Sequence, residues 1–275
     1  MLLCFWDYDT QWAGDRSRLP GGPKPWGHLE FECTERLLEL HDRYAIPACF
    51  AVVGAAALPG QRPYHDPEQV RRIHEAGHEI ASHAFRHEWL PGLGTRALRT
   101  VLRDSKDVLE QCIGAAVVSF VPPYNQPFDY PAGGSISLAE RREAGRERTG
   151  LHALCTALAD TGYRFCRVAY RPMHTRLAEL LLRRRLDRPA RPAMIAGVMC
   201  VRLNGPCGFD AESMAMIDRC VAQGGIAVIY GHPHSLRSGN SQDERALVPL
   251  LEHVCELRNE GRLRVSLPRH LLSPD

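Results

Sequence analysis

Two aspartates near the N-terminus are spaced so that they could act together on one substrate or one ion. Asp7 and Asp9 lie two residues apart in the string FWDYDT, and in an extended chain this spacing places both carboxylates on one face. Two acids on one face repel each other unless a cation or a proton lies between them. The alternative is a pair of strand-end acids that cap nearby backbone groups, and the pair alone does not separate the two.

A pair of histidines offers metal-ligating nitrogens. His83 and His87 lie in GHEIASHAFRHEWL, and on a helical turn residues i and i+4 project to the same side, close enough to bind one metal. Asp9 would complete a set of two histidines and one carboxylate that leaves positions for water and substrate. Such an open set fits catalytic zinc, although the same ligands suit iron and other divalent ions. For an isolated HxxxH string, a structural role is the alternative.

Two further strings offer proton-transfer and hydrogen-bonding groups. His232 and His234 follow an apolar segment in AVIYGHPHSL, with Pro233 fixing the turn. A histidine there can serve as a general acid near neutral pH. In FVPPYNQ, two prolines stiffen the chain and present the backbone N–H of Tyr124 rigidly, which makes it a candidate donor to a developing oxyanion.

The hydrophobic pattern predicts alternating elements that would position these residues. We expect strands at 2–6, 48–53, 80–82, 117–120, 195–203, 226–229 and 263–266. We expect helices at 34–44 (with Thr34 as N-cap), 67–76, 95–113, 151–162, 210–223 and 248–260. This alternation predicts a parallel sheet, closed or nearly closed into an α/β barrel. The candidate residues follow predicted strands, and active sites of such barrels lie at those strand ends.

Composition narrows the class of protein. The chain has 275 residues, 44% of them hydrophobic and 24% charged, which is ordinary for a globular protein. A formal charge of +2 is too balanced to predict a nucleic-acid partner. No apolar stretch approaches the roughly 20 residues of a membrane span, and the N-terminus lacks the pattern of a signal peptide. Ten cysteines without CxxC spacing predict reduced, mostly buried thiols, and we expect a cytoplasmic protein.

Two segments interrupt the alternation. We expect a single domain over 1–275 with a long loop insertion near 126–150, which is rich in Pro, Gly, Ser and charge. The segment 176–192 is dense in arginine. It reads as a solvated helix face or, alternatively, as a contact for phosphate or a membrane surface.

Taken together, the strings resemble the NodB-type polysaccharide deacetylases of carbohydrate esterase family 4. The resemblance runs through ERLLELHDRYAIPACFAVVG, DPEQVRRIHEAGHEIASHAFRH, LRTVLRDSKDVLEQCIG, GGIAVIYGHPHS and LRVSLPRHLL, and so covers nearly the whole chain. It implies an α/β fold, a distorted, TIM-like (β/α)7–8 barrel.

The resemblance also implies a role for each candidate residue. Asp7 would be the catalytic base, His232 the catalytic acid, and Tyr124 the donor of the oxyanion N–H. Asp9, His83 and His87 would hold a divalent metal, most often Zn²⁺ in this family, with Co²⁺, Ni²⁺ or Fe²⁺ as alternatives. The expected substrate-binding residues are Arg16, Arg18, Trp12, Asn125 and His234. Trp26, Trp89 and Phe128 could likewise stack on sugar rings or pack in the core.

The sequence departs from the family pattern in three places. The first motif is DYD, with one residue between its aspartates. Val121 stands where the family commonly has an arginine that pairs with the base, and Arg16 or Arg18 are the candidate replacements. His234 is an extra histidine beside His232, and the sequence leaves open which of the two donates the proton.

The expected reaction is metal-assisted hydrolysis of an N-acyl amino sugar, most often an N-acetyl one. The substrate would be a polysaccharide or its nucleotide- or lipid-linked precursor. The resemblance is to members associated with surface-polysaccharide, lipopolysaccharide and O-antigen biosynthesis. Three alternatives remain: a deformylase of a formamido sugar, a metal-independent hydrolase of ureides or cyclic amides, and an inactive sugar-binding homologue. The intact metal-ligand set counts against the second, and Val121 is the main support for the third. The sequence leaves the oligomeric state open.

Overall fold

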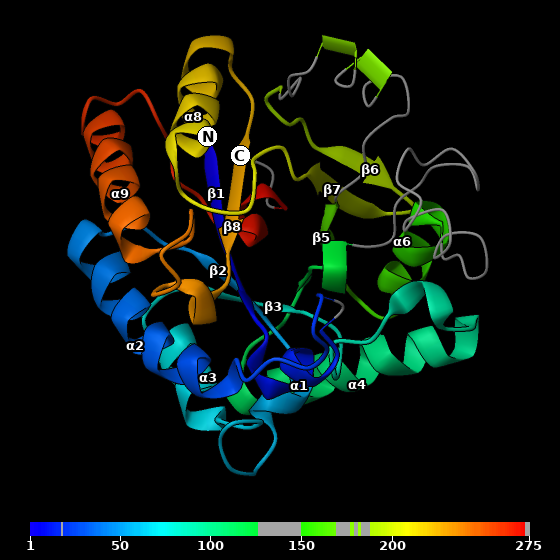
Figure 1. Ribbon diagram of the computed structural model, residues 1–275. Coiled ribbons are helices and arrows are strands. Elements are labelled where there is room, and N and C mark those ends of the chain that lie inside the picture. Colours follow the sequence, from blue (N-terminus) through cyan, green and yellow to red (C-terminus); the bar gives the residue numbers. More distant parts are fainter. Residues whose placement is uncertain (18, 126–149, 169–176, 179–180, 183–187, 273–275) are drawn as a thin grey trace.

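The backbone forms one curled eight-stranded sheet wrapped by helices (Figure 1). The computed structural model describes residues 1–17, 19–125, 150–168, 177–178, 181–182 and 188–272. The sheet has the order β6-β7-β5-β4-β3-β2-β1-β8, and among the strand pairs of the described residues only β6–β7 is antiparallel. The strands are β1 (Leu2–Tyr8), β2 (Cys49–Val52), β3 (Glu79–Ser82), β4 (Ser119–Phe120), β5 (Phe165–Val168), β6 (Ala193–Ile195), β7 (Val198–Arg202) and β8 (Ala227–Gly231). The predicted distorted α/β barrel is confirmed.

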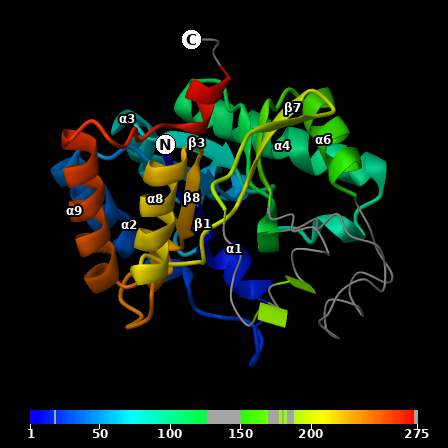
Figure 2. The ribbon, with the colours of Figure 1, turned by 90° about the horizontal axis from the view of Figure 1, so that it is seen from above.

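Helices cover the outer surface of this sheet, as Figure 2 shows from above. They are α1 (Thr10–Asp15), α2 (Gly27–Tyr44), α3 (Pro67–Glu75), α4 (Thr95–Ile113), α6 (Leu151–Asp160), α8 (Ala211–Gln223) and α9 (Glu244–Asn259). Aspartate side chains cap three of them by accepting backbone N–H groups of the first turn: Asp66 at α3, Asp210 at α8 and Asp243 at α9.

The alternation of side chains along β1 decides what faces the inside of the barrel. All seven residues of β1 are buried, because helices cover one face and the barrel interior covers the other. Trp6 and Tyr8 belong to the large cluster between sheet and helices, whereas Leu3 and Phe5 belong to the smaller cluster inside the barrel. Asp7 continues the Leu3–Phe5 series, so the strand itself directs this carboxylate inward.

Several predicted boundaries need correction. The helix predicted at 34–44 begins at Gly27, and Thr34 is not its N-cap, because its hydroxyl donates to the carbonyl oxygen of Glu30 inside α2. The helix predicted at 248–260 begins at Glu244, one turn earlier. The final strand predicted at 263–266 amounts to a single bridge between Val265 and Leu2.

Four further expectations concern the cysteines, membrane-spanning helices and two irregular segments. All ten cysteines are free thiols, as predicted, and most are buried. Among the described residues, no helix combines the length and the apolar character that crossing a bilayer requires. The loop insertion predicted near 126–150 lies outside the described residues except for its last residue, and so do residues 176, 179–180 and 183–187 of the arginine-rich segment 176–192.

Candidate active site

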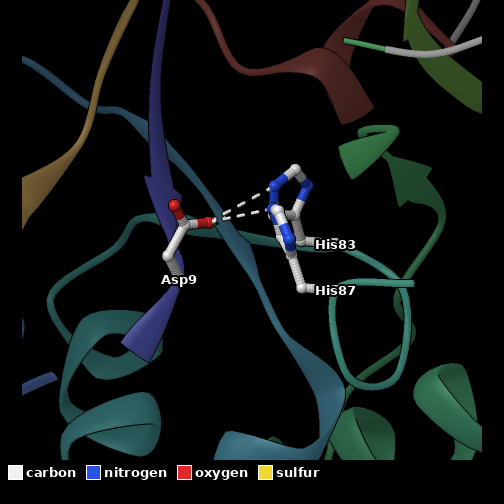
Figure 3. A group of neighbouring side chains, drawn as sticks. All are labelled: Asp9, His83 and His87. Atoms are coloured by element: carbon white, nitrogen blue, oxygen red, sulfur yellow. Dashed lines mark ion pairs between the residues drawn. The ribbon is translucent and has the colours of Figure 1, made fainter. Parts of the chain in front are cut away.

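Asp9, His83 and His87 converge on one buried point at the mouth of the barrel (Figure 3). One ligand atom from each lies within 4.8 Å of the others. The Oδ1 atom of Asp9 is 3.4 Å from Nε2 of His83 and 3.6 Å from Nε2 of His87. This oxygen is buried and has no hydrogen-bond partner among the described residues. A buried oxygen that faces two imidazole nitrogens is a donor set that fits a divalent cation.

A turn, and not a helix, brings the two histidines together. His83 follows β3 directly, and the chain then turns through Ala84 and His87 with φ values of 62° and 58°. The prediction that a helical turn spaces the pair is therefore wrong, although the predicted convergence is confirmed. Nδ1 of His83 lies 2.7 Å from the carbonyl oxygen of Val121. Donating its Nδ1 proton there leaves Nε2 as the lone-pair nitrogen, which is what metal ligation needs.

Asp7 is held by a buried arginine inside the barrel. Arg167 donates from Nη1 to Oδ1 at 2.9 Å and from Nη2 to Oδ2 at 2.6 Å, and both residues are almost fully buried. Burial alone would raise the pKa of Asp7, but the charge of Arg167, helped by His83 and His232, holds it below its usual value. Asp7 is therefore ionised, as a general base must be.

The cation beside Asp7 differs from the one that we predict from the sequence. The guanidinium of Arg16 lies over the ring of Trp12, and Arg18 lies outside the described residues. Arg16 is thus not the partner of Asp7. Arg167 comes from β5, for which we predict no strand. The available signal was the string FCRV, in which Arg167 follows Phe165 at the inward-facing spacing of two.

His232 and His234 have different partners, Gln242 for His232 and Glu30 for His234. Nδ1 of His232 lies 2.9 Å from Oε1 of Gln242 and 3.7 Å from the thiol of Cys207. Burial would lower the pKa of His232, but the Cys207 thiol and the nearby carboxylates of Asp9 and Asp7 raise it well above its usual value. The charge of His232 is therefore coupled to the carboxylates of Asp9 and Asp7.

Tyr124 and Asn125 lie beside the metal-ligand cluster in the turn after β4. Both have positive φ values, 57° and 53°. The ring of Tyr124 packs against His87 with ring centroids 4.4 Å apart. The side-chain oxygen of Asn125 accepts from Arg167 at 3.2 Å, and its amide donates to the hydroxyl of Tyr230 at 3.1 Å. Asn125 thus also helps to hold the arginine that holds Asp7.

A cavity of about 670 Å³ extends outward from the cluster. Of the predicted substrate-binding residues, Asn125 and His234 line it. Trp26 lines it as well, whereas Trp12 packs against Tyr64 with ring centroids 5.0 Å apart and is not among the lining residues. The lining residues are Asp7, Asp9, Ala13, Ser17, Leu19, Trp26, Leu29, His83, His87, Tyr124, Asn125, His232, His234, Ser235, Arg237, Ser238, Asn240 and Gln242.

Known proteins resemble parts of this chain. A family model described as polysaccharide deacetylase matches residues 25–132. The chain is 32% identical over 92 residues to a chitooligosaccharide deacetylase of Sinorhizobium fredii, a match that spans 33% of this chain and 40% of that protein. The chain thus covers less than half of the length of this relative.

Solved structures share the fold at low sequence identity. A putative polysaccharide deacetylase from Mycobacterium smegmatis superposes with a TM-score of 0.59 at 18% identity, covering 98% of this chain and 87% of that one. The allantoinase Puue superposes with a TM-score of 0.58 at 14% identity, covering 98% and 88%. These likenesses show the fold alone. The family model matches residues 25–132, which is less than half of the chain, and the solved structures share its barrel fold.

Proposed function

We propose that the protein is a metal-dependent hydrolase that removes an N-acyl group, most often N-acetyl, from an amino sugar. The observation that carries this proposal is the pairing of two features in one cavity: the Asp9–His83–His87 cluster, and a carboxylate at Asp7 that Arg167 holds ionised. The local similarity to a chitooligosaccharide deacetylase supports a sugar as the substrate.

A divalent ion, which we propose to be Zn²⁺, would be held by Asp9, His83 and His87, and would polarise the amide carbonyl and make a water molecule more acidic. Asp7 accepts a proton from the attacking water. The backbone N–H of Tyr124 donates to the carbonyl oxygen as negative charge develops on it. His232 then donates a proton to the departing amine, because an unprotonated amine leaves an amide poorly.

The products of this reaction are a free amino sugar and the carboxylate of the acyl group. We propose a nucleotide- or lipid-linked precursor as the natural substrate. This part of the proposal follows from the resemblance of the sequence to proteins of surface-polysaccharide and O-antigen assembly.

The first test is a substrate panel given to zinc-loaded protein, with acetate release as the readout. The panel holds N-acetylglucosamine, its 1-phosphate, UDP-N-acetylglucosamine and chitotetraose, together with an N-formylated amino sugar assayed for formate. Acetate release that a chelator abolishes is the expected result. Formate release without acetate release would replace the proposal with a deformylase. No release from any of these substrates by protein that holds its metal would favour an inactive sugar-binding homologue.

The structure bears on two of the alternatives. The inactive homologue was supported by Val121, and the bidentate contact of Arg167 with Asp7 removes that support. A metal-independent hydrolase would have no use for three buried ligand atoms facing one another, and Asp9, His83 and His87 form such a set.

A further inference from the structure

A third carboxylate lies behind the metal-ligand cluster and takes no part in the mechanism described above. Glu30, in α2, is completely buried. Its Oε1 accepts the backbone N–H of Asp9 at 3.2 Å, and its Oε2 lies 2.9 Å from Nδ1 of His234. Burial raises the pKa of Glu30, while the hydrogen bond to His234 opposes that rise. Burying a carboxylate costs desolvation free energy. The two hydrogen bonds of Glu30 orient the backbone of Asp9 and the ring of His234.

His234 is held on two sides. The carboxylate of Glu30 accepts a hydrogen bond from Nδ1–H, which leaves Nε2 as the nitrogen for a ligand. The imidazole stacks on the indole of Trp26, with ring centroids 4.4 Å apart and planes 6° apart. Both residues line the cavity. The histidine is therefore a rigid hydrogen-bonding group on the cavity wall.

His232 and His234 are neighbours on the cavity wall. The charge of His232 acts on both Asp7 and Asp9, whereas the carboxylate that His234 meets is Glu30. The two imidazole centroids are 5.2 Å apart. A ligand whose amide lies at Asp9 and beside His232 would thus reach His234 with its next group of atoms.

We propose that His234, Trp26 and Glu30 form a subsite for the sugar ring, in which Nε2 of His234 hydrogen-bonds a ring hydroxyl. This inference rests on the proposed function. Glu30 is the positioning residue, since it fixes the ring and its tautomer. A hydroxyl fits either protonation state of His234: it donates to Nε2 of the neutral ring and accepts from Nε2–H of the charged ring. A phosphoryl oxygen without a proton can only accept.

The test removes each side of the proposed hydrogen bond in turn: the imidazole of His234 in the protein and one hydroxyl in the sugar. Wild type and His234→Ala, both zinc-loaded, are assayed with N-acetylglucosamine and its 3-, 4- and 6-deoxy analogues for kcat/KM, and for Kd by calorimetry. With wild type, one deoxy analogue should show a kcat/KM about tenfold lower, or a Kd about tenfold higher, than N-acetylglucosamine, as expected for a lost hydrogen bond to an oriented partner. In His234→Ala, that difference should shrink to less than about twofold. His234→Ala should raise KM with little change in kcat and no loss of zinc.

Glu30→Gln tests the positioning role. It should weaken the discrimination against the same deoxy analogue. The Glu30→Gln/His234→Ala double variant should have the same kcat/KM as His234→Ala alone, because both substitutions act on the same contact between His234 and the sugar. His253→Ala is the matched control, since His253 pairs with Asp218 on α9 and α8, away from the cavity. This variant should keep wild-type values throughout.

Three results would overturn the proposal. One is that wild type and His234→Ala distinguish N-acetylglucosamine from its deoxy analogues by the same factor. The second is a Glu30→Gln variant that loses zinc or thermal stability while its preference between sugar and deoxy sugar stays unchanged. The third is wild-type protein that makes no distinction among the analogues in either kcat/KM or Kd. Failure of the proposed function has a different signature: measurable Kd values for the sugars with no acetate released.

Discussion

Arg167 and Asp7, 160 residues apart in the chain, form a bidentate ion pair inside the barrel, with N–O distances of 2.9 and 2.6 Å. Each side chain comes from an inward-facing position on its strand. The guanidinium also lies over the rings of Phe5 and Tyr230, at 5.1 and 4.6 Å from their centroids. The cation that the family resemblance places at position 121 is thus supplied from β5.

Replacing this arginine should leave Asp7 buried without its counter-ion. In Arg167→Met, burial would raise the pKa of Asp7, so a larger fraction of Asp7 would be protonated at a given pH. The acid limb of the kcat/KM profile should therefore move to higher pH, and activity at neutral pH should fall at least about tenfold. Arg164→Met, at an exposed position just before β5, is the control. An unmoved acid limb in Arg167→Met would show that the ion pair does not govern the base.

Neutralising Asp7 should separate metal binding from turnover. Asp7→Asn removes the proton acceptor but leaves Asp9, His83 and His87 in place, so kcat should fall about 100-fold or more while metal content stays at the wild-type level. His83→Ala should lose both. Asp218→Asn, at a surface pair with His253, is the matched control. Full activity of purified Asp7→Asn would remove Asp7 from the catalytic role.

Ser105 should support the turn that carries the metal-ligating histidines. Its buried hydroxyl donates to the carbonyl oxygen of Ala84 at 2.9 Å and lies 2.8 Å from the hydroxyl of Ser82. Ser105→Ala removes one of two hydrogen bonds to that carbonyl, the other coming from the backbone N–H of Gly54, which should cost about 0.5–1.5 kcal/mol of stability and weaken zinc affinity about tenfold. Thr156→Ala, which removes an exposed hydroxyl on α6, should change neither. Zinc titration and thermal unfolding are the measurements, and unchanged zinc affinity would contradict the role.

Buried histidines should make the fold acid-sensitive. His41 accepts the indole N–H of Trp6 at 2.8 Å. Burial, and the charge of His78, lower the pKa of His41 to about 3, and burial lowers that of His78 to about 4. Between these values and the ordinary 6.5, the unfolded chain binds protons that the folded chain does not. The free energy of unfolding should thus decrease as the pH is lowered through this range, by about 1.4 kcal/mol per pH unit for each such histidine.

Urea unfolding between pH 7 and pH 4 measures this slope, with a chelator present so that metal release does not contribute. His41→Gln should be less stable at pH 7 but should lose less stability on acidification. Equal slopes for the two proteins would show that His41 does not take up a proton on unfolding.

The convergence of Asp9, His83 and His87 is predicted from the sequence because these residues follow short-range patterns at the ends of strands. Asp7 follows from the period of a strand, whereas Asp9 lies just past the end of β1, in helical backbone conformation at the N-cap of α1. Helix α4 (Thr95–Ile113) matches its predicted bounds, with a left-handed Gly114 ending the helix. His83 and His87 converge as predicted even though a turn replaces the predicted helical turn. Spacing along the chain was sufficient information for these elements.

Contacts between distant segments were beyond this kind of inference. Arg167 lies in a four-residue strand whose inward face becomes apparent only when β5 pairs with β4 and β7. Glu30 is similar, because it lies before the predicted helix start at Thr34 and the sequence does not single it out. Both residues meet their partners, Asp7 and His234, through the closure of the sheet and its helices.

The proposed mechanism requires that Asp9, His83 and His87 hold one metal ion. Elemental analysis of untagged wild-type protein, beside an Asp9→Ala/His83→Ala variant checked for folding, measures this. We expect about one zinc or other divalent ion per wild-type chain and none in the folded variant. Wild-type protein that binds no metal, even after incubation with zinc, cobalt or nickel, would contradict the proposed metal site.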